Sequence, residues 1–121
     1  MGRFWSGFGH ALRGGETLLR TQRHARVHAV ATLLVLALGA FLGLARWEWA
    51  AVAVAVGAVW CAEALNTAVE FLSDRVTREE DPLIKKAKDV AAFGVLAASL
   101  GAAAVGGIVF VPHLIRFVAA R

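Results

Sequence analysis

The sequence predicts an all-α membrane protein, with one short helix on the membrane surface and three membrane-spanning helices in a single domain, residues 1–121. Three observations predict this fold class. Hydrophobic residues make up 59% of the chain and the mean hydropathy is +0.64, more than a soluble domain of this size usually carries. The apolar residues form three stretches long enough to cross a bilayer. The charged residues gather between these stretches.

Residues 4–20 predict an amphipathic helix at the membrane interface. Phe4, Trp5 and Phe8 alternate with polar residues and arginines, and such a helix buries its apolar face in the headgroup region. The Gly14-Gly15 pair weakens the helix and predicts a bend. A disordered tail is the alternative, and the aromatic content argues against it.

The first predicted span covers residues 27–44. Gly39 and Gly43 in it form a GxxxG pair, which either permits close helix contact in lipid or arises by chance in a Gly- and Ala-rich span. A short turn, residues 46–49, follows. It contains two tryptophans, which are typical of the boundary between water and lipid.

The second and third predicted spans cover residues 50–72 and 90–111. We expect the second to continue past Glu70 as one helix that emerges from the membrane. A charged loop, residues 75–88, follows and contains Asp81-Pro82; proline favours an extended conformation in the residue before it. We expect the third span to end at Pro112.

The distribution of lysine and arginine predicts the orientation. Five precede the first span and five lie in the 75–88 loop, whereas the 46–49 turn has one and the C-terminus has two. The positive-inside rule therefore places the N-terminus and the 75–88 loop in the cytoplasm and the C-terminus outside. The formal net charge of +4 fits anionic lipid headgroups better than nucleic acid, because the basic residues flank apolar spans and do not alternate with base-stacking aromatics.

A stripe of polar residues enters the second span and predicts the functional site. At about 100° per residue the stripe falls on one helix face, and ionisable groups within a span are functional by default. Walker A, GxGxxG and protein-kinase signatures are absent. We call these residues the polar stripe: Glu63, Asn66, Thr67, Glu70 and Asp74.

The polar stripe suits phosphoryl transfer, which needs positioning, a metal ion and a base for the attacking hydroxyl. Glu63 lies deepest and suits a general base near a lipid hydroxyl. Glu70, nearer water, suits Mg²⁺. Lys88 suits a phosphate, and Asp89 could orient Lys88 or a ribose hydroxyl. The alternative is structural: Glu70 and Asp74 would pair with Arg75 or Lys88, and the residues 79–81 and 85–86 would form a solvated loop.

Three motifs identify a family: Glu63-x-x-Asn66-Thr67-Ala68-x-Glu70-x-x-x-Asp74-Arg75, then Ala87-Lys88-Asp89, and Phe8-x-x-Ala11-x-x-Gly14 in the surface helix. With these motifs the chain resembles the bacterial diacylglycerol kinase/undecaprenol kinase family of small integral-membrane kinases. The resemblance covers nearly the whole chain. It implies a lipid kinase that uses ATP and Mg²⁺, with the bilayer, a membrane lipid and two further copies in a homotrimer as partners and with active sites shared between subunits. The resemblance further implies that the spans lie in the inner membrane of a bacterial cell.

The resemblance also implies roles for individual residues. Glu63 would be the catalytic base, Asn66 its neighbour at the lipid substrate, and Glu70 a ligand of Mg²⁺ and ATP. Lys88 and Asp89 would contact the phosphates and the nucleotide. The remaining nucleotide contacts implied are His10, Glu79, Glu80 and Asp81.

One departure from the family concerns the metal site. Family members often place a glutamate before the first span as a second metal ligand, whereas this chain has Gln22. An amide oxygen binds Mg²⁺ more weakly than a carboxylate, so Gln22 predicts a site that holds one ion, or that holds it only with ATP bound. A member that has lost activity is the extreme form of this departure.

The lipid substrate stays open between undecaprenol and diacylglycerol, which both present a primary hydroxyl. Arg23-x-x-Arg26-x-His28 resembles a pattern of the undecaprenol-kinase branch and favours undecaprenol. A non-catalytic oligomer, such as a channel or an assembly subunit, is the alternative function. A channel would need polar residues throughout residues 50–62, and that stretch offers only Trp60 and Cys61.

Overall fold

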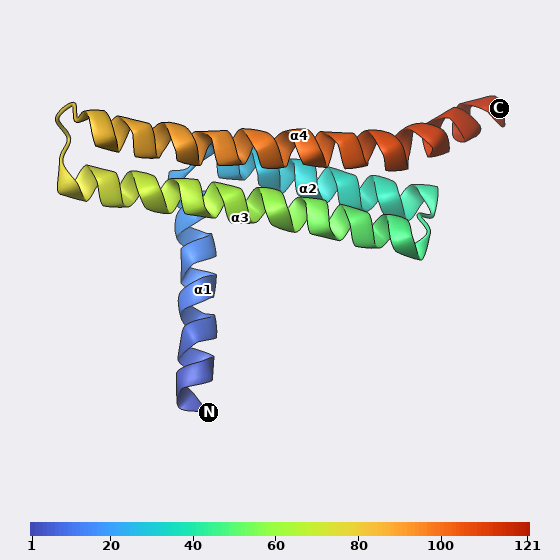
Figure 1. The fold of residues 1–121 in the computed structure, drawn as a ribbon. Coiled ribbons are helices and arrows are strands. Elements are labelled where there is room, and N and C mark those ends of the chain that lie inside the picture. The colour runs from blue at the N-terminus through green and yellow to red at the C-terminus, as the bar shows by residue number, and fades with distance from the viewer.

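The protein consists of four α-helices and no strand in a computed structural model that describes residues 1–121 (Figure 1). The helices are α1 (Gly2–Thr21), α2 (Arg23–Leu42), α3 (Arg46–Val76) and α4 (Pro82–Ala119). The last three are long and apolar enough to cross a membrane. The prediction of an all-α fold with three candidate membrane spans is therefore confirmed.

Helices α3 and α4 run antiparallel, with α2 packed beside them, whereas α1 leaves this bundle at a steep angle (Figure 1). The corner between α1 and α2 forms at Gln22, whose backbone is extended. The Arg26 guanidinium donates to the carbonyls of Leu19 and Arg20, at 3.4 and 3.3 Å. These bonds use carbonyls at the end of α1 that have no helical partner, so they fix the direction in which α1 departs.

Helix α1 exposes Phe4, Trp5, Phe8 and Leu12. Because α1 is steeply inclined to the bundle axis, a bundle that spans a bilayer would place this aromatic face along the membrane surface. The interfacial position of α1 stays a prediction. The predicted bend at Gly14-Gly15 was wrong, since α1 continues through both glycines.

Helix α3 has 31 residues, or about 46 Å at 1.5 Å per residue, and it continues past Glu70 as predicted. The loop after it is shorter than the predicted 75–88, because α4 already begins at Pro82. Asp81 Oδ1 accepts the backbone N–H groups of Leu83 and Ile84, at 2.9 and 3.1 Å. This N-cap, together with proline at the first helical position, favours a helix start inside the charged segment.

Two further helix ends differ from the expected ones. Helix α2 begins at Arg23, before the predicted start of the first span. Helix α4 does not end at Pro112 but continues to Ala119. Proline removes one backbone donor and bends a helix without necessarily ending it. The end of α4 accordingly curves away from the bundle in Figure 1.

The protein core is small. Only 12 of 121 residues are buried, and the apolar cluster of Leu44, Val52, Val109 and Phe110 lies near the α2–α3 turn. Beside it the buried carboxylate of Glu48 lies 3.0 Å from His113 Nε2, which joins the start of α3 to α4. Most large apolar side chains face outward, so they need a bilayer or other copies of the chain to cover them.

The two glycines of the GxxxG pair have different structural roles. Gly43 ends α2 in the left-handed region, with φ of 73°. At Gly39, a Cβ atom would lie 2.7 Å from Trp49 Cη2 and 3.0 Å from Leu44 Cδ1. Trp49 therefore packs against α2 and is half-buried, whereas Trp47 is exposed, as expected for an aromatic belt.

We expect Gly39→Ala to lower the thermal unfolding temperature in detergent, because the added methyl group overpacks a contact with an indole ring, at a cost of about 1–3 kcal/mol. The matched control is Gly57→Ala in α3, where a Cβ atom meets nothing within 4 Å. There, alanine should be neutral or stabilising. Equal unfolding temperatures for the two variants would contradict the close Gly39–Trp49 contact.

Candidate active site

The polar stripe on α3 runs from a buried to an exposed end. Glu63 and Thr67 are buried, with the Glu63 side chain 5% exposed. Asn66 and Glu70 are half-buried, and Asp74 is exposed. A reaction at Glu63 would therefore be shielded from water, while a water-soluble substrate could approach from the end of α3.

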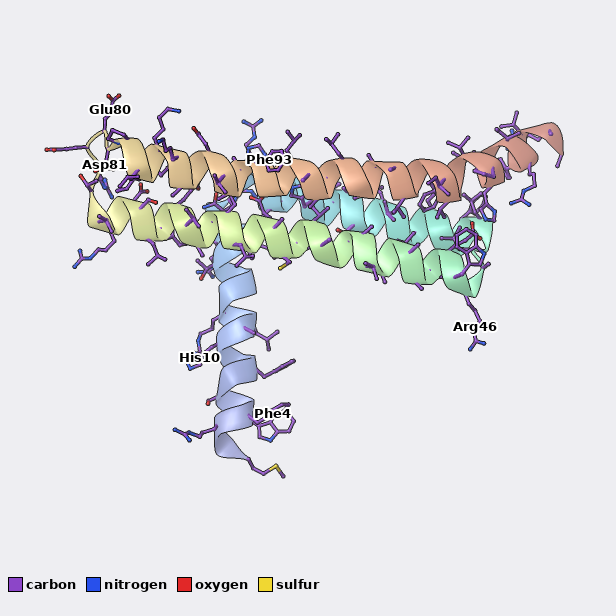
Figure 2. The ribbon with its side chains drawn as sticks, in the orientation of Figure 1. Phe4, His10, Arg46, Glu80, Asp81 and Phe93 are labelled. Atoms are coloured by element: carbon purple, nitrogen blue, oxygen red, sulfur yellow. The ribbon has the colours of Figure 1, made fainter.

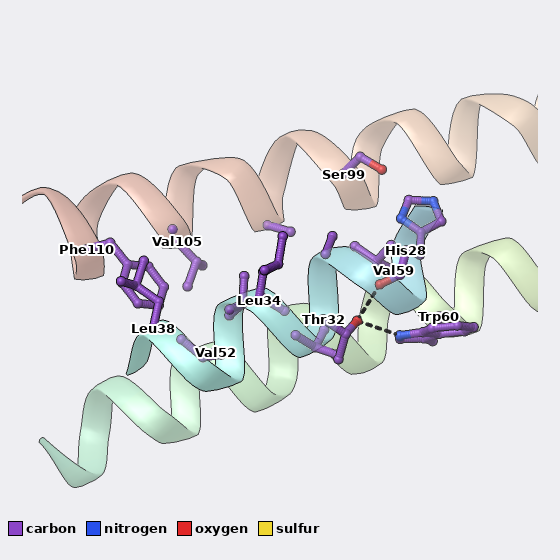
Figure 3. Close-up of a pocket in the computed structure, with 16 residues that line it drawn as sticks. His28, Thr32, Leu34, Leu38, Val52, Val59, Trp60, Ser99, Val105 and Phe110 are labelled. Carbon is purple, nitrogen blue, oxygen red and sulfur yellow. Dashed lines mark hydrogen bonds between the residues drawn. The ribbon is translucent and has the colours of Figure 1, made fainter. Parts of the chain in front are cut away.

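Glu63 has one ionisable neighbour within ion-pair distance. His28 Nε2, on α2, lies 3.8 Å from Glu63 Oε2. The His28 ring is edge-on to Trp60, with centroids 6.5 Å apart. Thr32 links the two residues: its hydroxyl donates to the His28 carbonyl at 2.7 Å and accepts the Trp60 indole N–H at 3.0 Å (Figure 3). These contacts hold the polar ends of α2 and α3 in register.

An apolar groove of about 400 Å³ adjoins this polar pair. It runs between α2, α3 and α4 from His28 and Trp60 to Phe110 (Figure 3), and 12 of its 16 lining residues are hydrophobic. The groove can hold a hydrocarbon chain, and its polar end lies beside the histidine that faces Glu63. The arrangement suits an amphiphile that carries one hydroxyl group.

Glu70 is a carboxylate of the polar stripe without a partner in the chain. Neither Glu70 nor Asn66 makes a side-chain hydrogen bond or an ion pair within the chain, and the Gln22 amide nitrogen donates to Thr21 Oγ1, which leaves its oxygen free. No cluster of three His, Cys, Asp or Glu residues could hold a metal ion alone. Mg²⁺ usually takes one or two carboxylates and completes its shell with phosphates and water, so these residues fit a magnesium ion that arrives with a nucleotide.

Two lysines near the start of α4 form ion pairs, one of them with the exposed end of the stripe. Lys88 Nζ lies 3.4 Å from Asp74 Oδ1, which is the pair that the structural alternative named for Asp74. Asp89 contacts Lys85 at 2.8 Å, one helical turn away, and not Lys88 as expected. This hydrogen bond, and then the charge of Asp89, raises the pKa of Lys85, so its ammonium group keeps its charge throughout the physiological pH range.

The chain does not bring the other predicted nucleotide residues to Glu63. His10 is exposed on α1 beside Arg13 and away from the bundle (Figure 2). Glu80 and Asp81 lie at the end of the bundle where α3 is connected to α4 (Figure 2). Glu79 is in the same loop, where its N–H donates to Thr77 Oγ1. Because α3 ends at Val76, about 20 Å of helix separates Glu63 from this loop.

Sequence reasoning did not place three residues in the site: His28, Thr32 and Trp60. A signal for the first two was present, because a histidine and a threonine four positions apart share one helix face within an otherwise apolar span. Trp60 gave no such signal, since an aromatic residue in a span is ordinary. The contacts of His28 with Glu63 and of Thr32 with Trp60 required the packing of α2 on α3.

Comparison with known proteins places the chain among membrane lipid kinases. The family model described as "Prokaryotic diacylglycerol kinase" matches residues 9–110. An undecaprenol kinase of Bacillus subtilis is 36% identical over 94% of this chain and 93% of its own length. A diacylglycerol kinase of Synechocystis is 35% identical over 89% of this chain but only 62% of its own length. The matched region contains the whole polar stripe.

Proposed function

Because this chain belongs to the prokaryotic diacylglycerol kinase family and is a lipid kinase, we propose that it transfers the γ-phosphoryl group of ATP to the primary hydroxyl of undecaprenol. The observation that carries this proposal is the buried carboxylate of Glu63, which lies 3.8 Å from His28, a residue at the polar end of an apolar groove. A base in that position can reach the hydroxyl of a lipid whose chain stays in the hydrophobic region.

In the proposed reaction, Glu63 accepts the hydroxyl proton while the lipid oxygen attacks the γ-phosphorus of ATP and the bond to ADP breaks. Asn66, half-buried one turn along α3, orients the hydroxyl. Glu70, and more weakly Gln22, would hold Mg²⁺. The ion supplies charge neutralisation for the transferring phosphoryl group. Burial of the base excludes water as a competing acceptor.

We assign the nucleotide to the exposed end of the polar stripe. Lys88 would exchange Asp74 for a phosphate oxygen, since a surface pair of this kind holds its partners by only about 0–1 kcal/mol. Asp89, one residue further along α4, would contact the nucleotide as well. The residues of the 77–81 segment would contact the nucleotide further from the reacting phosphate; these are Glu79, Glu80 and Asp81.

A homotrimer would complete this site. His10 lies too far along α1 to meet the polar stripe of its own chain (Figure 2), and the bundle leaves apolar side chains exposed on all its helices. We propose that α1 of one subunit reaches the stripe of its neighbour and brings His10 to the nucleotide. The basic N-terminus and the 75–88 segment would face the cytoplasm of the bacterial cell, where ATP is found.

Undecaprenol is favoured over diacylglycerol by two observations. The undecaprenol kinase relative matches nearly its full length, whereas the chain spans less than two thirds of the diacylglycerol kinase relative. The lining of the groove is almost purely apolar, with Thr32 and Ser99 as its hydroxyl groups. It therefore offers few donors for the ester carbonyls that a diacylglycerol carries.

The test is phosphate transfer from labelled ATP in detergent micelles, with undecaprenol and diacylglycerol in parallel and Mg²⁺ varied. We expect label in undecaprenol with a kcat/KM at least about tenfold above that for diacylglycerol, which corresponds to 1.4 kcal/mol of transition-state binding. We also expect no transfer after Mg²⁺ is chelated. Preferential labelling of diacylglycerol would overturn the substrate, and no label in either lipid would overturn the kinase activity.

A further inference from the structure

The buried carboxylate of Glu63 needs a partner that keeps it in place. Its side chain is 5% exposed, and isolated burial of a carboxylate is strongly unfavourable unless a partner compensates. Backbone donors cannot supply this compensation, because the N–H groups in the interior of α3 are used by the helix itself. The one charged or polar partner within reach in the chain is His28.

From this geometry we infer that His28 is a positioning residue for Glu63, which holds its carboxylate toward the end of the apolar groove. The inference rests on the proposed function, since it assumes that Glu63 is the base. His28 carries a proton on Nε2 in the imidazolium form and in one neutral tautomer. This N–H group attracts Glu63 Oε2 electrostatically and so favours one orientation of the carboxylate.

The distance between the two groups matters for this role. At 3.8 Å the pair is close enough for electrostatic attraction but longer than a direct hydrogen bond of 2.7–3.2 Å. The carboxylate therefore keeps its lone pairs available for a substrate hydroxyl. A tight hydrogen bond would instead occupy an oxygen that the base needs.

The His28 ring is itself held in place. Thr32 fixes the backbone of its helical turn, Trp60 packs edge-on against the ring, and the side chain is 23% exposed. The ring also lines the apolar groove (Figure 3). An imidazole fixed on α2 thus links the groove, which would hold the lipid chain, to the carboxylate on α3 that would receive the proton.

The test compares two amides of different reach at position 28. In His28→Gln the amide nitrogen takes the approximate place of ring Nε2 and can still donate toward Glu63, whereas in His28→Asn it falls short, at the place of Nδ1. His28→Leu removes the donor altogether. The matched control is His24→Leu, on an exposed residue of the same helix that has no partner.

We expect His28→Asn and His28→Leu to lower kcat by about 10- to 100-fold, the size of effect that a misplacement of about 1 Å can produce. The KM for the lipid and for ATP should stay within about threefold. His28→Gln should keep kcat within about threefold of the unmodified protein, and His24→Leu should leave it unchanged. Thermal unfolding of each variant in detergent provides the readout for a purely structural role.

Each outcome decides a separate point. If Gln and Asn lower kcat equally, or if the loss of kcat follows the unfolding temperature, His28 is a packing residue and the inference is overturned. Unchanged kcat in His28→Leu, with Glu63→Gln inactive, overturns the inference alone. An active Glu63→Gln variant overturns the assignment of the base in the proposed function, whatever the variants at position 28 show.

Discussion

Glu63→Gln should lower kcat for lipid phosphorylation by about 10²- to 10⁴-fold, the usual contribution of a general base. The substitution keeps the shape of the side chain and removes the group that accepts the proton. Because the amide can still bind a hydroxyl group, the KM for lipid should change by less than about threefold. Steady-state transfer of labelled phosphate from ATP measures both constants.

The control for this variant is Glu48→Gln, which neutralises the other buried carboxylate of α3. Glu48 lies at the opposite end of the helix beside His113, so its loss should affect unfolding more than kcat. If Glu63→Gln retained more than about a tenth of the original kcat, Glu63 would not be the base. Equal losses in both variants would point to a general effect on folding.

If Glu70 binds Mg²⁺ as proposed, Glu70→Gln should lower kcat/KM for ATP by at least about 10- to 100-fold, because losing even a residue that only orients a metal ligand costs that much. The side chain has no partner within the chain, so no structural contact is lost with its charge. The defect should shrink as Mg²⁺ is raised, since an amide oxygen still binds the ion weakly. Titration of Mg²⁺ at fixed ATP measures this shift.

A matched control for this second variant is Glu16→Gln on α1, whose carboxylate pairs with Arg20 on an exposed surface. It should leave the Mg²⁺ dependence unchanged, because an exposed pair is worth only about 0–1 kcal/mol. A Glu70→Gln variant with an unaltered Mg²⁺ requirement would remove Glu70 from the metal site. Gln22→Glu offers the converse test: a restored carboxylate should lower the Mg²⁺ concentration that gives half-maximal activity.

Local patterns predicted most of the fold. Three apolar stretches of membrane length became α2, α3 and α4, and the unbroken helical periodicity beyond Glu70 became one helix to Val76. The errors fell at helix boundaries, where local signals compete. The charge of the 82–88 segment suggested a loop, although Asp81-Pro82 is a strong start signal for a helix. Pro112 suggested the end of a helix, although a helix can bend at proline and continue.

The sequence by itself determined which three segments are long and apolar enough to span a membrane. It also determined that the polar stripe enters the second of them, and which family the chain resembles. Each of these depends on residues that are close in the chain or share one helix face, so helical geometry is sufficient to derive them. Only the tertiary structure decided that His28 faces Glu63, that Lys88 pairs with Asp74, and that Trp49 requires glycine at position 39. These contacts join different helices. They depend on how one helix is rotated and shifted against the next, and periodicity along a single helix contains no information about that.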